Sequence, residues 1–302
     1  DFILAVGGGS VIDSSKAIAD GMGEKEYDVW EIYEKKRAPK KSIKVGAILT
    51  IAAAGSEMSD SSVISNEKTN EKRGCNSNLC RLKFVVMDPM YTMSLPDYQS
   101  MAGCTDIMMH TLERYFTQGG NMDMTDRIAS ELLKNVMKYA TILHKKPDDY
   151  EARAEIMWCS SLSHNGLTGC GANGTDFASH RLEHELSGYY DVTHGAGLAA
   201  IWCSWARYVY KDCMDRFLKY AKDVWGIEGE DKDKVVLASI QKMEDFFKSI
   251  GMPTSIKELG VSLSDEDIEK LAISCDKGVG GKIGTAKVLH YEDFVNIYKM
   301  AR

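Results

Sequence analysis

The chain opens on an apolar strand that runs directly into glycines and then into a helix. Residues 2–6 read FILAV, residues 7–10 read GGGS, and the following VIDSSKAIADGM places apolar residues at helical spacing. A strand joined to a helix through a glycine turn is the unit of parallel α/β sheets, and few other folds accommodate it. The glycines let a ligand approach the backbone, and the start of the helix favours an anionic group. The turn lacks G-x-G-x-x-G spacing, so alone it leaves pyrophosphate binding and a plain tight turn equally open.

The spacing of apolar residues changes near residue 97. Upstream, SIKVGAILTI, SSVIS and RLKFVVMDP read as further strands separated by polar loops. Downstream, apolar residues recur every three or four positions, most clearly in one stripe: Ile128, Leu132, Leu133, Val136, Met137, Ala140 and Leu143. We therefore predict an α/β domain with a Rossmann-like parallel sheet over residues 1–97 and an all-helical domain over residues 98–302.

The first strand predicts neighbouring strands that the sequence does not contain. A buried parallel strand needs neighbours on both sides, yet residue 1 is Asp and the apolar strand begins at once. We therefore expect the natural protein to carry upstream residues of the α/β domain.

Charge and cysteine content narrow the partners and the compartment. The net charge is −7, from 37 basic and 44 acidic residues with no basic block, which argues against nucleic acid or an anionic membrane as the main partner. No apolar run approaches the roughly 20 residues of a membrane span. The eight cysteines form no C-x-x-C pair, which is typical of reduced thiols in a cytoplasm. We expect a cytoplasmic location.

Four-residue spacings in the helical part predict a metal site. Asp106 and His110 lie four residues apart and share one helical face, and His180 and His184 repeat this spacing. His194 follows beyond the turn-like SGYYD and precedes a glycine. One such pair is common on helix surfaces, but two pairs and a third histidine in one helical domain favour a bound ion. The remaining histidines read as structural or solvated residues: His164, His144 and His290.

Three other interpretations fit parts of this pattern. HRLEH matches H-x-x-E-H, a zinc-peptidase motif in which both histidines would bind the metal and Glu183 would be the general base. A sugar-phosphate lyase of the dehydroquinate-synthase type would share the glycine strand and a helical metal domain, but it needs clustered basic residues. Only Arg114 and Arg181 lie near the proposed ligands. A degenerate binding protein is the third, although every proposed ligand is present.

Several motifs in order resemble one known family, the iron-dependent (group III) alcohol dehydrogenases, in the branch of butanol dehydrogenases and NADPH-dependent aldehyde reductases. The resemblance runs through essentially all 302 residues. It rests on GGGSVIDSSKAIA, LTIAAAGSEMSDSSVIS, VVMDPMYTMSLP, DIMMHTLERY, MWCSSLSHNGL and the spacing H-x3-H-x9-HG. It implies that roughly the first quarter of the natural chain, the upstream part of the cofactor domain, is absent.

The resemblance assigns roles residue by residue. It implies four metal ligands: Asp106, His110, His180 and His194. His184 matches a histidine that lines the active site without binding the metal, and we predict that it relays a proton or positions the substrate. The implied cofactor contacts are Gly8, Gly9 and Ser10 at the pyrophosphate, Thr50 beside the cofactor and Lys72 at the ribose near the nicotinamide.

The implied chemistry agrees with the residue types. Three imidazoles and one carboxylate suit Fe²⁺ or Zn²⁺ and leave room for a substrate oxygen. The resemblance implies an alcohol dehydrogenase or aldehyde reductase that uses NADP or NAD on a small alcohol or aldehyde of the butanol kind, and a homodimer. One departure is the segment GCNSNLCRL after Lys72, where relatives often carry aromatic residues and histidine.

Overall fold

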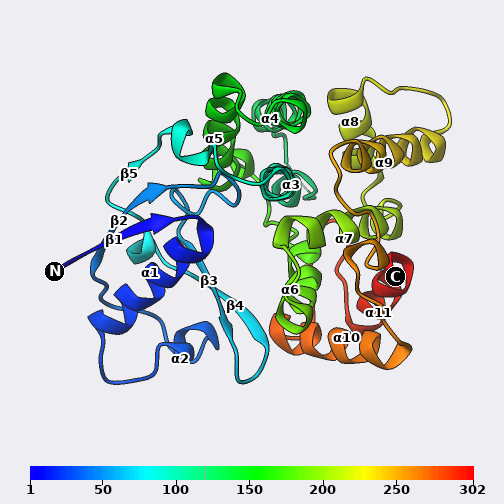
Figure 1. Cartoon of the computed structure of the whole chain (residues 1–302). Coiled ribbons are helices and arrows are strands. Elements are labelled where there is room, and N and C mark those ends of the chain that lie inside the picture. The colour runs from blue at the N-terminus through cyan, green and yellow to red at the C-terminus, as the bar shows by residue number, and fades with distance from the viewer. Residues whose placement is uncertain (119) are drawn as a thin grey trace.

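The chain begins with a small α/β region, on the left in Figure 1. The computed structural model describes residues 1–118 and 120–302. Three strands form a parallel sheet in the order β1, β2, β5, with Phe2 opposite Lys44 and Ala47 opposite Val85. The elements of this region are β1 (Phe2–Gly7), α1 (Gly9–Gly23), α2 (Trp30–Tyr33), β2 (Lys44–Leu49) and β5 (Val85–Val86). The predicted fold class, an α/β region with a parallel sheet followed by a helical domain, is confirmed.

The glycine turn brings the ends of β1 and β2 together at one edge of the sheet. The apolar residues Ala5 and Ile12 join the same buried core as Leu49. The backbone N–H of Thr50 donates to the carbonyl of Gly7 at 3.1 Å. Carboxyl ends of parallel strands are where α/β sheets bind ligands, so the fold places the glycine turn at a binding edge.

SSVIS forms a strand as predicted, but it does not join the parallel sheet. It is β3 (Ser61–Asn66), which pairs antiparallel with β4 (Glu71–Asn76) in a separate hairpin. The sequence of β4, EKRGCN, has no apolar alternation: Lys72 lines the cleft, Arg73 lies 3.1 Å from Glu185 of the helical region, and Cys75 packs against the small apolar cluster of Ala17, Ile32 and Tyr33. This hairpin reaches the helical region: a Cβ on Gly188 would lie 2.5 Å from the carbonyl oxygen of Asn70.

Helices fill the rest of the chain, as the change of apolar spacing near residue 97 predicts. Helix α3 crosses the centre of the helical region, with every residue from Ser100 to Tyr115 buried. The glycine cluster KGVGGKIGT lies at the end of α10 and in the loop that follows, where Gly280 ends the helix with φ +73°. The helices are α3 (Asp97–Tyr115), α4 (Asp123–Lys145), α5 (Tyr150–His164), α6 (Ala178–Tyr190), α7 (His194–Val209), α8 (Met214–Trp225), α9 (Lys232–Ser249), α10 (Asp265–Val279) and α11 (Tyr291–Ala301).

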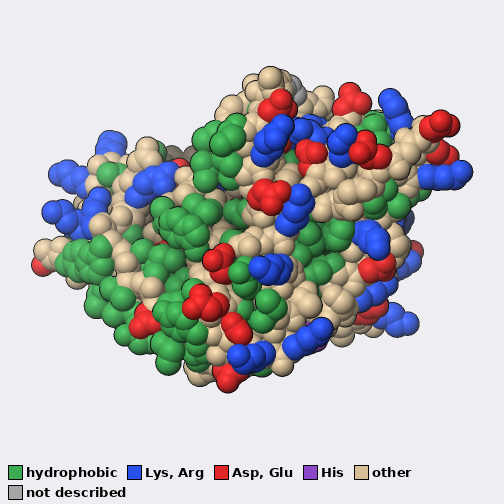
Figure 2. Space-filling model, turned by 90° about the horizontal axis from the view of Figure 1, so that it is seen from above, with side chains coloured by type: hydrophobic (Ala, Val, Ile, Leu, Met, Phe, Trp, Pro, Cys, Tyr) green, Lys and Arg blue, Asp and Glu red, His purple; other side chains and the backbone are tan. Residues whose placement is uncertain are grey.

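The two regions differ at the surface. In Figure 2 hydrophobic side chains gather on the left, the side of the α/β region, whereas charges of both signs spread over the right. Alternate residues of β1 are about half exposed: Phe2 by 47%, Leu4 by 50% and Val6 by 56%. The burial predicted for FILAV therefore holds on one face only. No helix in the described ranges is long and apolar enough to cross a membrane.

Candidate active site

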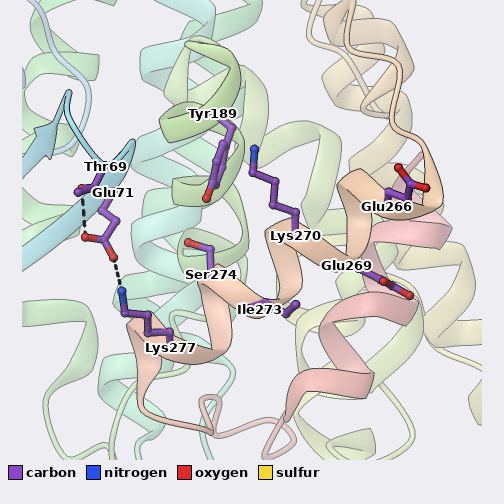
Figure 3. Close-up of a pocket in the computed structure, with 9 residues that line it drawn as sticks. All are labelled: Thr69, Glu71, Tyr189, Glu266, Glu269, Lys270, Ile273, Ser274 and Lys277. Atoms are coloured by element: carbon purple, nitrogen blue, oxygen red, sulfur yellow. Dashed lines mark hydrogen bonds and ion pairs between the residues drawn. The ribbon is translucent and has the colours of Figure 1, made fainter.

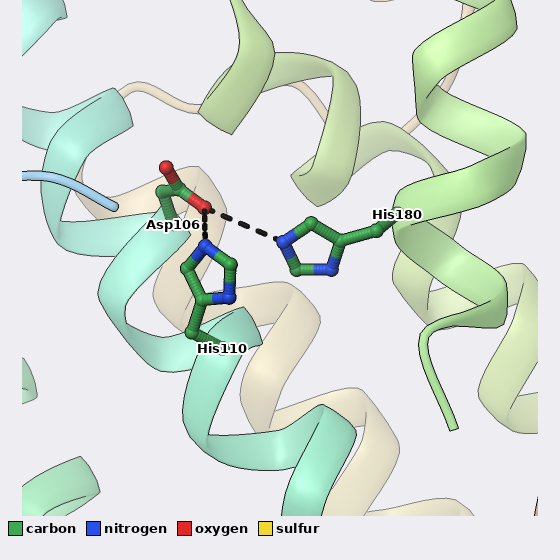
Figure 4. Close-up of side chains that lie close together, drawn as sticks. All are labelled: Asp106, His110 and His180. Carbon is green, nitrogen blue, oxygen red and sulfur yellow. Dashed lines mark ion pairs between the residues drawn. The ribbon is translucent and has the colours of Figure 1, made fainter. Parts of the chain in front are cut away.

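Two helices bring three of the predicted ligands together. Asp106 and His110 face the same way from α3, and His180 meets them from α6 (Figure 4). The Oδ1 atom of Asp106 lies 3.4 Å from Nε2 of His110 and 3.6 Å from Nε2 of His180. All three side chains are buried. The four-residue spacing on α3 thus produces the convergence that it predicts.

The donor atoms of this group fit a divalent metal ion. Oδ1 of Asp106 and Nε2 of His180 are buried and have no hydrogen-bond partner among the residues that the structure describes. Buried polar atoms without partners are costly, so such atoms that face one another indicate a ligand that satisfies them. A carboxylate and imidazole nitrogens suit Fe²⁺ or Zn²⁺.

His194 approaches the same carboxylate from a third helix. It begins α7, and its Nε2 lies 3.8 Å from Oδ1 of Asp106. The next residue, Gly195, packs against α3 so closely that a Cβ would lie 1.9 Å from the carbonyl oxygen of Ala102. The start of α7 is therefore set by the helix that carries Asp106. The structure thus brings the Nε2 atoms of all three predicted histidine ligands within 3.8 Å of Oδ1 of Asp106.

Two buried glutamates hold the histidines by their other ring nitrogens. Nδ1 of His180 lies 2.9 Å from Oε1 of Glu113, and Nδ1 of His194 binds Glu183. Such carboxylates orient metal-binding imidazoles and raise their basicity. No sequence motif identified Glu113 as part of the site. It lies seven residues after Asp106 on the same face of α3, and this extended spacing could have indicated it.

Burial and mutual charge set the protonation of these groups. Burial, together with the positive charges of its neighbours, lowers the pKa of His110 well below its ordinary value. Burial alone would raise the pKa of Asp106, but the surrounding histidines hold it below its ordinary value. For His180 burial acts to lower the pKa, and the carboxylates of Asp106 and Glu113 outweigh it and raise the pKa to about 9. The Asp106 carboxylate is thus ionised at neutral pH and available to a cation.

His184 lies beside the cluster, in the arrangement predicted for it. Its ring centroid is 6.5 Å from that of His180 and 5.7 Å from that of His194. Its Nδ1 lies 3.5 Å from a guanidinium nitrogen of Arg181. Burial first, and then the charges of Lys72 and Arg181, lower the pKa of His184 well below its ordinary value. The imidazole is neutral at physiological pH.

The peptidase interpretation of HRLEH finds no support in this geometry. Glu183, its general base, binds His194 and the hydroxyl of Ser187, and its Oε2 lies 3.7 Å from Nζ of Lys72. Burial raises the pKa of Glu183, but the charges of His194 and Lys72 outweigh it and the net shift is downward. Its carboxylate is engaged in orienting a histidine instead of facing an open metal site.

A cleft of about 990 Å³ joins the cluster to the glycine turn. Gly8, Gly9 and Ser10 line it on the α/β side, Lys72 lines it from β4, and the four ligands line it on the helical side. A Cβ on Gly9 would meet nothing within 4 Å, so this backbone is open to a ligand. Thr50 is not among the residues that line the cleft, although it adjoins Gly7 through its backbone.

His164 belongs to the site, although the sequence indicated only a core or interface residue. Its ring centroid lies 3.9 Å from that of His110, and its Nδ1 lies 2.5 Å from the carbonyl oxygen of Ala54. Burial, reinforced by the charge of Arg114, lowers its pKa to about 3. It is a neutral ring that packs against a predicted ligand.

A second, shallower cavity of about 480 Å³ lies between the hairpin tip and α10 (Figure 3). Its two lysines contact other lining residues: Nζ of Lys277 lies 3.1 Å from Glu71, and Nζ of Lys270 lies 4.3 Å from the ring centre of Tyr189, whereas no histidine lines this cavity. The large cleft is therefore the candidate active site.

Comparison with known proteins agrees with this geometry. Residues 1–89 match the family described as "Iron-containing alcohol dehydrogenase", and residues 100–302 match "Fe-containing alcohol dehydrogenase family, C-terminal". The chain is 40% identical over 301 residues to the NADH-dependent butanol dehydrogenase A of Clostridium acetobutylicum, which covers 99% of this chain and 76% of the relative. It is 34% identical over 262 residues to the NADPH-dependent aldehyde reductase YqhD of Escherichia coli, which covers 86% of this chain and 67% of the relative.

Solved structures give the same result. The crystal structure of NADH-dependent butanol dehydrogenase A from Thermotoga maritima superposes with a TM-score of 0.94 at 38% identity and covers 99% of this chain and 75% of that one. The structure of E. coli YqhD gives a TM-score of 0.95 at 32% identity and covers 100% of this chain and 77% of that one. The parallel sheet, the helical domain and the cluster of histidine and aspartate residues agree with these matches. The chain belongs to the iron-containing alcohol dehydrogenase family.

Proposed function

We propose that this enzyme reduces short-chain aldehydes such as butanal, and oxidises the corresponding alcohols, with NADH or NADPH and a divalent iron or zinc ion. One observation carries the proposal. Three imidazole Nε2 atoms, from His110, His180 and His194, lie 3.4, 3.6 and 3.8 Å from Oδ1 of Asp106, in a cleft whose opposite wall is the glycine turn.

Each residue of the cluster has a defined part in this proposal. Asp106, His110, His180 and His194 would hold the ion, and Glu113 and Glu183 keep two of the imidazoles oriented toward it. When bound, the metal would polarise the carbonyl oxygen of the aldehyde and the dihydronicotinamide would supply a hydride to the carbonyl carbon.

The cofactor contacts come from the α/β side. The backbone at Gly8, Gly9 and Ser10 begins α1 and would bind the pyrophosphate. Lys72 reaches across the cleft to the helical side, with Nζ 3.4 Å from Nδ1 of His194, and would contact the ribose near the nicotinamide. Thr50 would support the turn from beside it, since it does not line the cleft.

His184 would position the substrate. Its lowered pKa keeps the ring neutral, so it can donate or accept one hydrogen bond beside the reacting oxygen. Of the two roles that the sequence left open, proton relay and positioning, the neutral ring favours positioning.

The boundary near residue 97, the cytoplasmic location and the homodimer belong to the same proposal. Helix α3 begins at Asp97, where the α/β elements end. All eight cysteines are unpaired, which is typical of a reducing compartment. The homodimer rests on the family resemblance.

A metal analysis combined with an aldehyde panel tests the proposal. We expect one Fe²⁺ or Zn²⁺ per chain and oxidation of NADH or NADPH that depends on butanal. Replacing Lys72 by Ala (Lys72→Ala) should raise the KM for the cofactor by about tenfold, because a charge-assisted contact is lost, and should leave the metal content unchanged. An exposed lysine at the end of α4 that does not line the cleft, changed by Lys145→Ala, provides the control. Butanal-independent turnover, or an unchanged cofactor KM in Lys72→Ala, would contradict it.

A further inference from the structure

Three cationic side chains line the large cleft, and they differ in how their charge is balanced. These are Lys72, Arg114 and Arg181. Nζ of Lys72 lies 3.7 Å from the carboxylate of Glu183. Arg114 is buried, and its guanidinium donates to the carbonyl of His110 at 2.6 Å. Arg181 has no comparable partner.

Among the described residues, the guanidinium of Arg181 has one polar side-chain partner: its Nη1 lies 3.5 Å from Nδ1 of His184. Throughout residues 1–118 and 120–302, no carboxylate oxygen lies within 4.0 Å of it. The neighbouring strand leaves room for this side chain, because a Cβ on Gly74 would lie 3.9 Å from its Nη1. Gly74 and His184 both line the cleft, so the charge of Arg181 stands at the cleft wall beside His184.

The carboxylates of this part of α6 and α3 already bind other residues. Glu185 lies 3.1 Å from a guanidinium nitrogen of Arg73. Glu113 accepts from the backbone N–H of His180 at 3.1 Å and lies 2.9 Å from its Nδ1. Each therefore holds another group and acts on Arg181 only as a charge beyond 4.0 Å, so the guanidinium keeps N–H donors that an incoming anion can use.

The position of Arg181 relates this charge to the reaction centre. His180 belongs to the predicted ligand cluster. The ring centroid of His184 lies 6.5 Å from that of His180, and its Nδ1 lies 3.5 Å from the guanidinium of Arg181, so His184 contacts the guanidinium and adjoins the cluster. A molecule with its aldehyde at the cluster could therefore extend past His184 and present its far end to Arg181. A guanidinium presents paired N–H donors that match a carboxylate in bidentate geometry.

We propose that Arg181 binds the carboxylate of the substrate, so that the enzyme prefers short aldehydes with a terminal carboxylate, such as 4-oxobutanoate, over neutral aldehydes of the same length. This inference rests on the proposed function, because the aldehyde end is placed at the metal cluster. The inference adds a class of substrate to the proposed function.

Paired substrates and variants test the proposal. We compare kcat/KM for 4-oxobutanoate and for its methyl ester, which keeps the carbon chain and removes the charge. Arg181→Gln should lower kcat/KM for 4-oxobutanoate by about 10- to 100-fold, as expected for a lost hydrogen bond between charged groups, and should change the value for the ester less than about threefold. Arg181→Lys should restore part of the loss. Arg127→Gln, at an exposed position on α4, is the control.

A binding measurement separates this proposal from the proposed function. Calorimetric titration of the metal-loaded protein with 4-hydroxybutanoate should show binding that Arg181→Gln weakens by a similar factor, whether or not turnover is detected. If butanal and the ester are reduced but Arg181→Gln affects both 4-oxoacid and ester equally, the carboxylate role is wrong and the proposed function stands. If Arg181→Gln instead raises the KM for the cofactor with every aldehyde, Arg181 serves a cofactor phosphate, and the proposal is overturned. If no aldehyde is reduced, the proposed function fails, and the titration still decides the role of Arg181.

Discussion

The site contains two groups of potential ligands that look alike in sequence and differ in structure. In each of the two groups the ligand atoms lie within 4.8 Å of one another; the groups are Asp106, His110 and His180, and Glu183, His184 and His194. In the first group, Oδ1 of Asp106 and Nε2 of His180 have no hydrogen-bond partner in the described part of the chain. In the second, Glu183 binds Nδ1 of His194 and is further neutralised by Lys72. The first group therefore offers donor atoms that suit a cation, whereas the carboxylate of the second is engaged by neighbouring side chains.

The difference teaches how to read clusters of histidine and carboxylate. The distances between ligand atoms alone would predict two metal sites. The hydrogen bonds and ion pairs of these atoms instead indicate one metal site and a second group that orients one of its ligands. His194, a member of the second group, links the two groups, since its Nδ1 faces Glu183 and its Nε2 faces Asp106. It is the residue through which the supporting group acts on the cluster.

The largest expected effect comes from removing a ligand of the first group. Asp106→Ala should abolish metal binding and lower kcat by at least about 10³-fold, because the charge stabilisation supplied by the ion is lost. His194→Ala should behave in the same way if its Nε2 is the fourth ligand. Metal content by elemental analysis, beside the aldehyde reductase rate, is the measurement. Full metal occupancy in His194→Ala would show that His194 is not a metal ligand and belongs only to the second group.

A smaller effect is expected from the histidine that belongs only to the second group. His184→Ala should keep the metal and lower kcat by roughly 10²-fold, the contribution typical of a group that assists proton movement or substrate orientation. The rate and the metal content are measured on the same sample. Loss of the metal would make His184 a ligand and remove the distinction between the groups.

The smallest effect concerns acid stability near the first group. The pKa of His164 is lowered to about 3, whereas an unfolded chain takes up this proton near 6.5. Its contribution to stability is thus fully present above about pH 6.5 and is lost as the pH falls toward 3, by at most about 2 kcal/mol at pH 5. His164→Asn, which keeps a donor for the carbonyl of Ala54, should flatten this decline in urea unfolding at pH 7.5, 6 and 5. An unchanged decline would contradict the prediction.

Much of this arrangement could be predicted from the sequence, because it depends on local periodicity. The apolar run and glycines of FILAVGGGS, with the helical spacing of the residues that follow, predict the strand, turn and helix at the start. The four-residue spacing of Asp106 and His110 predicts that they share a face of α3. What could not be predicted depends on contacts between distant segments. Strand β4 is polar on both faces because Lys72 faces the cleft while Arg73 reaches Glu185 on α6. Nothing local in EKRGCN indicates either contact.

The partners of the histidines illustrate the same limit. Glu183 fits a peptidase motif within its own helix, and only the position of α7 shows that it binds His194. The apolar pattern of β1 likewise predicts burial, but cannot state which face of the strand is covered. Residues 2, 4 and 6 are about half exposed.

The contact between Gly195 and the carbonyl of Ala102 has a consequence for substitution tolerance in this fold. A single added methyl group at residue 195 would displace α7 from α3 before it touched any donor atom of the site. His194 and Gly195 therefore depend on each other, because the glycine allows the close helix contact that fixes the position of the histidine. A search for distant members of this architecture should weigh the glycine as heavily as the imidazole, although the glycine takes no part in the chemistry.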